Sequence, residues 1–244
     1  MREDEFGGLK VRILGGNDRE GDLDTPGGPG GPVVVLLHGF GAPGTDLIPI
    51  WRVLDVPHPV RFVFPEAPVS LASSGYGAGR AWWMLDLEGL ERRARGEDVP
   101  DRSGELPEGL EPAREQLDAM MTELQSRMAV GPERIVLGGF SQGSMLACDW
   151  AVQSGAQLAG LVLLSSTLIA RERWVAGMPS LAATPVLQTH GTEDPLLPLE
   201  AAEQLRDLLR EAGVDVAWHA FRGGHELPGM VLAELAAFIT ARLS

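Results

Sequence analysis

The pentapeptide GFSQG at residues 139–143 constrains the fold more than any other segment of the chain. It follows a short apolar run from Ile135 to Gly138, and apolar residues at helical spacing follow it. This predicts a buried strand that turns sharply into a helix beginning near Gln142. The pattern G-x-S-x-G in that setting is typical of a nucleophile elbow, whose glycines keep Cβ atoms away from the adjacent strand and helix. We therefore expect an exposed Ser141 hydroxyl in front of the first N–H groups of the helix.

Strand-like apolar runs alternate with helical patterns from Val33 onward, which predicts a mostly parallel sheet with helices on both faces. The chain has 244 residues and no internal repeat, so we expect one α/β domain over residues 1–244. The expected strands are 9–14, at a half-exposed edge, then 33–37, 60–64, 135–138, 161–165, 185–189 and 214–221. A first helix is expected after residues 33–37, with Thr45 or Asp46 as its cap and Leu47, Ile50 and Leu54 facing the core. A second helix follows the elbow. Further helices are expected at 111–128, 199–212 and 228–243.

Three segments show no sustained periodicity. Residues 15–32 are rich in Gly, Pro and Asp, which predicts a flexible connection between two strands. Residues 87–109 are strongly charged and are interpreted as an exposed insertion, either a lid over a site or a solvated excursion. Residues 171–180 are expected to be irregular.

Charge and cysteine content exclude several classes of function. A formal charge of −14 argues against nucleic acid or an anionic membrane as a partner, because both need a positive surface. The single cysteine, Cys148, excludes an intramolecular disulfide and is expected to be a small buried apolar residue. The first residues lack the apolar region of a signal peptide, and no apolar run is long enough to span a membrane, so we expect a cytoplasmic protein without stable membrane insertion. The oligomeric state stays open, a homodimer included.

A serine hydroxyl needs an adjacent base to act as a nucleophile at neutral pH. Three histidines follow Ser141 in the chain. We favour His225 as the base, because it lies in a loop between the last strand and the last helix. His219 falls inside a predicted strand, and His190 is expected to shape the turn that it ends.

The base needs a carboxylate that fixes its tautomer, and the segment HGTEDP at residues 190–195 offers two. Asp194 is favoured, because Pro195 stiffens the turn and the chain order Ser, Asp, His matches that of α/β-hydrolases. Glu193 is the alternative.

Two backbone N–H groups are expected to stabilise the oxyanion that forms during attack on a carbonyl. One is that of Gln142, directly after the serine. The other comes from the glycine-rich loop that follows residues 33–37, where Phe40 is favoured and Gly41 or Ala42 is possible. His38 is expected to brace this loop through hydrogen bonds.

These motifs together resemble the phospholipase/carboxylesterase family of α/β-hydrolases, which includes bacterial carboxylesterases and acyl-protein thioesterases. The matching segments are LHGFG at 37–41, PEAP at 65–68, WWMLD at 82–86, GFSQG at 139–143, HGTEDP at 190–195 and GHE at 224–226. The resemblance implies an α/β-hydrolase fold without a large cap domain, a triad of Ser141, Asp194 and His225, and an oxyanion hole formed by the amides of Phe40 and Gln142. It also implies an acyl groove lined by apolar loop residues, for which Trp83, Leu196 and Leu227 are the candidates by position.

The sequence departs from the family pattern in two places. It has APG at residues 42–44 where thioesterase-like members carry Asp-Thr/Ser-Gly, and its segment 87–109 is longer than the usual connection. Our prediction is a serine carboxylesterase for short- to medium-chain esters that needs no metal or cofactor. The alternatives are an acyl-protein thioesterase or lysophospholipase for long acyl chains and a non-catalytic ligand-binding protein.

Overall fold

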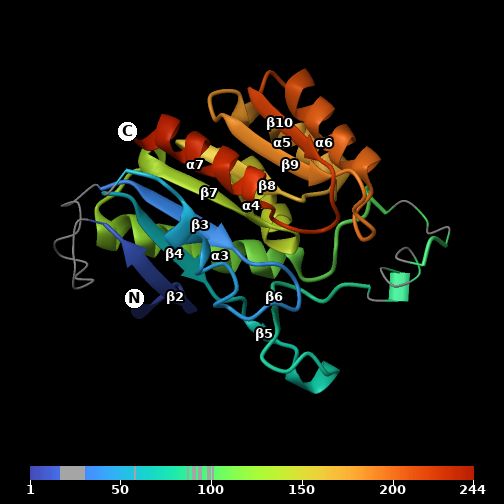
Figure 1. Ribbon diagram of the computed structural model, residues 1–244, viewed down its shortest axis with the longest axis horizontal. Helices are drawn as coiled ribbons and strands as arrows, with labels where there is room; N and C mark the ends of the chain where they lie inside the picture. Colours follow the sequence, from blue (N-terminus) through green and yellow to red (C-terminus); the bar gives the residue numbers. More distant parts are fainter. Residues whose placement is uncertain are drawn as a thin grey trace.

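Within the described residues, eight strands form one sheet in the order β1-β2-β4-β3-β7-β8-β9-β10 (Figure 1). The strands from β4 to β10 in that order are parallel, and β1 and β2 run antiparallel at one edge. The mostly parallel α/β sheet predicted from the sequence is therefore confirmed. The strands are β1 (Arg2–Phe6), β2 (Leu9–Gly15), β3 (Val33–Leu37), β4 (Arg61–Pro65), β7 (Ile135–Phe140), β8 (Gly160–Leu164), β9 (Val186–Gly191) and β10 (Val216–Phe221).

The structure is a computed structural model. It describes residues 1–16, 31–57, 59–86, 88–89, 92, 95–97, 100 and 102–244. Most of the predicted connection 15–32 and part of the predicted insertion 87–109 lie outside the described residues.

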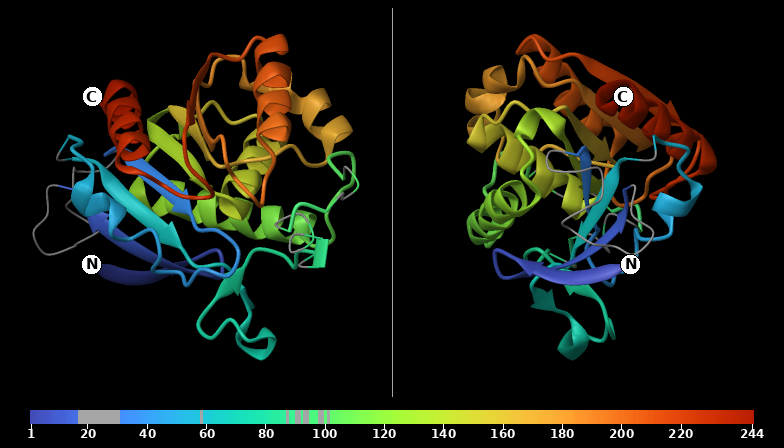
Figure 2. Two further views of the ribbon diagram at one scale, coloured as in Figure 1. Left: turned by 45° about the vertical axis from the view of Figure 1, so that its right-hand side comes forward. Right: turned by 90° about the vertical axis from the view of Figure 1, so that its left-hand side faces the viewer.

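Helices cover both faces of the sheet (Figure 2). A hydrophobic core lies on each face of the sheet, and the side chains of β3 alternate between the two cores. Val33, Val35 and Leu37 belong to one core and Val34 and Leu36 to the other, as the two-residue period of a strand requires. One face carries α3 (Leu110–Met128), α4 (Gln142–Ser154), α5 (Arg171–Gly177) and α6 (Leu199–Glu211), and the other carries α1 (Ile50–Val53) and α7 (Gly229–Leu243). Three short 3₁₀ helices are η1 (Ala72–Ser74), η2 (Pro132–Arg134) and η3 (Met178–Leu181).

The N-terminal edge of the sheet differs from the prediction. Residues 9–14 are not a half-exposed edge strand, because β2 lies between β1 and β4 and is buried from Val11 to Leu14. The edge strand is β1, whose sequence REDEF is too charged to signal a strand by itself. A small hairpin of β5 (Val69–Ser70) and β6 (Arg80–Ala81) was also not predicted, and it projects from the body of the molecule (Figure 2).

Two helical predictions need correction. The helix after the first parallel strand is only one turn, α1, and it begins after Pro49 without a side-chain cap, so neither Thr45 nor Asp46 caps it. Residues 171–180 are not irregular but form α5 and the start of η3. α5 is too short to show periodicity, and the buried indole of Trp174, hydrogen-bonded to Asp149 on α4, fixes it in place.

The described end of the charged segment is anchored to α5. The N–H of Ala170 donates to the carbonyl of Glu105 (3.1 Å), and the N–H of Arg171 donates to that of Ser103 (2.9 Å). Among the described helices, none combines the length and the apolar character that crossing a bilayer requires.

Candidate active site

Ser141 lies in a strained turn between β7 and α4. Its backbone has φ 54° and ψ −120°, a left-handed conformation that a non-glycine residue rarely adopts. A Cβ atom at Gly139 would lie 2.5 Å from the carbonyl carbon of Gly143, and one at Gly143 would lie 2.2 Å from the carbonyl oxygen of Leu37. The two glycines of the motif are therefore required by close backbone approach on both sides of the serine.

Asp194 and His225 form the hydrogen-bonded pair that the sequence predicted. His225 Nδ1 lies 2.6 Å from Asp194 Oδ2, and the Asp194 side chain is fully buried. Burial opposes ionisation of this carboxyl, but hydrogen bonds from His225 and from the N–H groups of Leu197 and Leu196 outweigh it, so the pKa of Asp194 lies below its usual value. An ionised Asp194 places the imidazole proton on Nδ1 and leaves Nε2 free as an acceptor.

The alternative acid, Glu193, points elsewhere. Its carboxylate forms an exposed ion pair with Arg222 at 3.1 Å. The geometry therefore favours Asp194 as the partner of His225.

His225 also packs against the elbow. Its ring centroid lies 4.7 Å from that of Phe140, the residue directly before Ser141. No hydrogen bond joins the Ser141 hydroxyl to His225, although both residues belong to the described part of the chain. Such nucleophile–base contacts commonly tighten only when a substrate binds.

The other two histidines have the structural roles expected of them. His190 is buried and hydrogen-bonds through Nε2 to the carbonyl of Leu197 (2.9 Å), which supports the Asp194 turn. Burial lowers the pKa of His190, which favours the neutral ring. His219 is half-exposed in β10, 3.5 Å from Glu234. The thiol of Cys148 is buried, and burial raises its pKa well above the usual value, so it is not a competing nucleophile.

Two backbone amides are available beside Ser141. The N–H of Gly41 donates to the carbonyl of Arg80 (2.9 Å), and that of Ala42 donates to the carbonyl of Gly39 (3.4 Å). The N–H of Phe40 has no acceptor among the described residues, so of the three it is the one free to bind an oxyanion. The second amide is that of Gln142, the first residue of α4.

His38 fixes the loop that carries Phe40. Its Nε2 accepts a hydrogen bond from the N–H of Ala67 (3.1 Å), so Nδ1 carries the proton and donates to the carbonyl of Gly39 (2.8 Å). Its own carbonyl accepts from the indole of Trp82 (2.9 Å). Burial lowers the pKa of His38, which favours this neutral tautomer.

The side chain of Gln142 has a role that sequence reasoning missed. It is fully buried, accepts a hydrogen bond from the N–H of Trp82 (3.0 Å) and donates to the carbonyl of Trp83 (2.8 Å). Gln142 therefore ties the WWMLD segment to the first turn of α4. The sequence did contain a signal for this role. The turn after the elbow was expected to be packed inside the fold, and a glutamine side chain buried there needs hydrogen-bond partners.

Two of the predicted substrate contacts line different cavities. Leu227 lines a cavity of about 270 Å³ together with His225, whereas Trp83 lines a separate cavity of about 440 Å³. Leu196 lines neither cavity and packs partly buried against the core. The single apolar groove expected from these three residues stays a prediction.

The parallel sheet, the elbow at Ser141 and the lack of a large cap domain among the described residues define an α/β-hydrolase fold. The family profile described as Phospholipase/Carboxylesterase matches residues 23–243, and the chain belongs to this family. A relative from Gibberella zeae named acyl-protein thioesterase 1 is 32% identical over 219 residues, which covers 86% of this chain and 90% of the relative.

Solved structures agree with this assignment. The structure of esterase PE8 is 30% identical, has a TM-score of 0.73, and the match covers 96% of this chain and 99% of that chain. The Bacillus cereus carboxylesterase, at 21% identity and a TM-score of 0.67, shows the same fold over 96% of this chain and 94% of its own.

Proposed function

We propose that this chain is a serine hydrolase that cleaves acyl thioesters and esters through an acyl-enzyme. The observation that carries the proposal is the hydrogen bond from His225 to the buried Asp194, with the His225 ring packed against Phe140 of the elbow. A strained serine, an oriented imidazole and two backbone amides as oxyanion donors would form the set of groups that acyl transfer requires.

The mechanism follows from the roles of these groups. His225 Nε2 removes the proton of Ser141, whose oxygen attacks the carbonyl carbon of the substrate. The amides of Phe40 and Gln142 stabilise the oxyanion, and Asp194 stabilises the imidazolium. The imidazolium then protonates the leaving oxygen or sulfur as its bond to the carbonyl carbon breaks. A water molecule activated by His225 hydrolyses the acyl-enzyme and regenerates Ser141.

Long-chain thioesters are the substrate class that we favour, in place of the short- to medium-chain esters expected from the sequence. The support is the 32% identical relative named acyl-protein thioesterase 1, together with further relatives of the same name at 26% and 28% identity. Esters of shorter acids are the second candidate, supported by the 30% identical esterase PE8.

A chain-length series tests both the chemistry and the substrate class. The p-nitrophenyl esters and the thioesters of acetate, butyrate, octanoate and palmitate are compared by kcat/KM. Peak activity on palmitoyl thioesters supports the favoured class, and a peak on acetate or butyrate esters supports the second candidate.

Two variants accompany this series. Ser141→Ala is expected to lose at least about 10³-fold in kcat, whereas Ser126→Ala, an exposed serine on α3, is expected to match the wild type. A Ser141→Ala activity within tenfold of the wild type would contradict the assignment of the nucleophile. Failure of a fluorophosphonate to label Ser141 would favour the non-catalytic alternative.

A further inference from the structure

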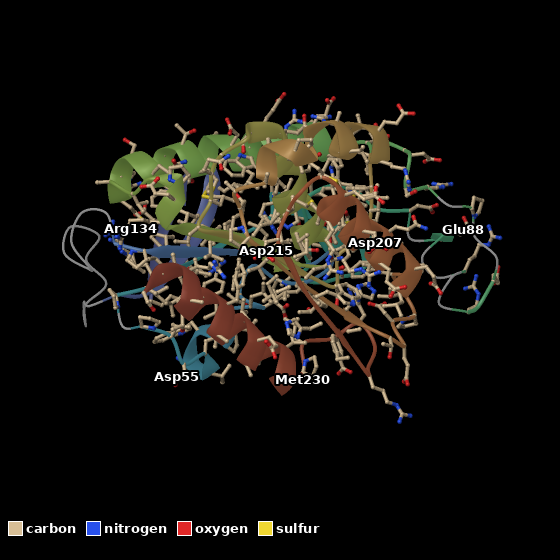
Figure 3. All side chains as sticks on the ribbon, turned by 90° about the horizontal axis from the view of Figure 1, so that it is seen from above. Asp55, Glu88, Arg134, Asp207, Asp215 and Met230 are labelled. Atoms are coloured by element: carbon tan, nitrogen blue, oxygen red, sulfur yellow. The ribbon has the colours of Figure 1, made fainter. Side chains whose placement is uncertain are left out.

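A cavity of about 270 Å³ opens directly beside His225 and is not explained by the steps above. Its lining comes from residues 46–50 at the start of α1, from the elbow, from the loop 225–227 and from the first turn of α7. The lining residues are Asp46, Leu47, Ile50, Phe140, His225, Glu226, Leu227 and Leu232. Met230, which lies between Leu227 and Leu232 in the sequence, is an exposed apolar side chain at the start of α7 (Figure 3).

The two charged residues in this lining are both carboxylates. Asp46 and Glu226 are exposed, and neither forms an ion pair with the described part of the chain. Glu226 accepts only a weak hydrogen bond from the N–H of Gly224 (3.3 Å). The neighbouring cation of the same loop, Arg222, is paired with Glu193 at 3.1 Å. The cavity therefore combines an apolar wall with uncompensated negative charge.

The proposed reaction assigns a part of the substrate to this cavity. The leaving atom must lie next to His225, because His225 delivers its proton to that atom, while the carbonyl oxygen points at the amides of Phe40 and Gln142. A group attached to the leaving atom is thus directed along the wall formed by His225 and Phe140. The acyl chain extends from the carbonyl carbon in a different direction, away from this wall.

We propose that this cavity is the leaving-group subsite and that Asp46 and Glu226 make it selective for apolar groups that are neutral or cationic. The inference rests on the proposed function. Thioesters of polyanionic thiols such as coenzyme A are poor substrates in this arrangement, because their phosphates meet two unpaired carboxylates. In the step concerned, the bond between carbonyl carbon and sulfur breaks, the electron pair stays on sulfur, and the His225 imidazolium supplies the proton.

Three butyryl thioesters vary the charge of the leaving group. Thiocholine is cationic, 3,3-dimethylbutane-1-thiol is its neutral counterpart of the same shape, and 3-sulfanylpropanoate is anionic. Release of the thiol is followed with a chromogenic disulfide. In the wild type we expect kcat/KM to fall from the cationic to the neutral to the anionic thioester, by about three- to tenfold at each step in low salt.

The charge-removing double variant Asp46→Asn, Glu226→Gln is expected to bring the three kcat/KM values to within about twofold of one another. Its matched control is Glu211→Gln, Asp215→Asn, which changes the net charge equally at two exposed residues. Asp215 directly precedes β10, at the opposite end of that strand from the His225 loop, about 20 Å away. The control is expected to keep the wild-type order.

The outcomes separate the two proposals. Equal kcat/KM values for all three thioesters in the wild type, or an unchanged order in the Asp46→Asn, Glu226→Gln variant, would overturn the leaving-group subsite while leaving the hydrolase intact. If the Glu211→Gln, Asp215→Asn control loses the preference for cationic thioesters as fully as the Asp46→Asn, Glu226→Gln variant does, the preference comes from net charge. That result would overturn the subsite as well. A wild type that hydrolyses none of the thioesters, nor any p-nitrophenyl ester, would refute the proposed function itself.

Discussion

Replacing Gly143 by alanine sets two opposing effects against each other in the first turn of α4. Helix propensity alone predicts that alanine stabilises a helix by about 1 kcal/mol relative to glycine. The position, however, leaves no room for a methyl group. The added Cβ would lie 2.2 Å from the carbonyl oxygen of Leu37, 2.5 Å from its carbonyl carbon and 2.6 Å from the carbonyl oxygen of His38.

Relief of this contact requires a movement of about 1 Å, because ordinary contacts to Cβ begin near 3.4 Å. The colliding atoms are backbone, so no side-chain rotation can make room. Overpacking of this kind costs about 1–3 kcal/mol or more, which outweighs the propensity gain. The Leu37–His38 backbone leads directly into Phe40, and misplacing one oxyanion donor costs about 10²–10³ in kcat.

Urea unfolding followed by tryptophan fluorescence, with kcat on p-nitrophenyl butyrate, measures both effects. We expect Gly143→Ala to lower both the free energy of unfolding and kcat. Gly229→Ala is the matched control, since no atom lies within 4 Å of a Cβ at this first residue of α7. A Gly143→Ala protein that is as stable and as active as the wild type would refute the argument that close backbone approach dictates the motif.

Two further substitutions probe buried polar groups of α4. Burial raises the pKa of Asp149 from 3.8 to about 6, so its ionisation destabilises the fold as the pH rises through this range. The variant Asp149→Asn keeps an acceptor for the Trp174 indole but cannot ionise. Its free energy of unfolding relative to that of the wild type is expected to rise by up to about 3 kcal/mol between about pH 4 and pH 8. The same difference at both pH values in urea unfolding would contradict this. Gln142→Leu leaves the N–H of Trp82 and the carbonyl of Trp83 buried without partners. We expect the free energy of unfolding to fall by about 2–5 kcal/mol in the same assay. An unchanged free energy of unfolding would show that the two hydrogen bonds do not stabilise the fold.

The position of Ser141 could be predicted from the sequence because the elbow is a local structure. The strand before it, the two glycines and the helix after it are contiguous, and each glycine has a steric reason that the structure shows. The meeting of Asp194 with His225 was also predictable, although 31 residues separate them. Each follows a parallel strand, β9 or β10, and parallel neighbours end at the same edge of a sheet.

Elements fixed by tertiary contacts were harder to predict. α5 has no amphipathic period over its seven residues and is fixed by the bond from Trp174 to Asp149, two residues from different helices. β1 is charged along most of its length and forms a strand because its backbone pairs antiparallel with the edge of β2. The partner of Trp174 lies 25 residues away in the sequence, where periodicity does not report it. The partner of β1 is the next strand, but the charged composition of β1 does not indicate the pairing.

The cavities show why the chemistry of a site is easier to predict than its specificity. A nucleophile, a base and an acid must each stand at a loop after a strand, and the order of the strands limits where they can meet. The wall beside His225 instead joins Phe140 of the elbow to Leu47 and Leu232, neither of which belongs to a motif. Side chains that fill the space between segments decide the shape of such a wall, and their positions in the sequence do not show which of them meet. The choice of leaving group therefore depends on residues such as Asp46 and Glu226, whose meaning appears only when the segments are folded together.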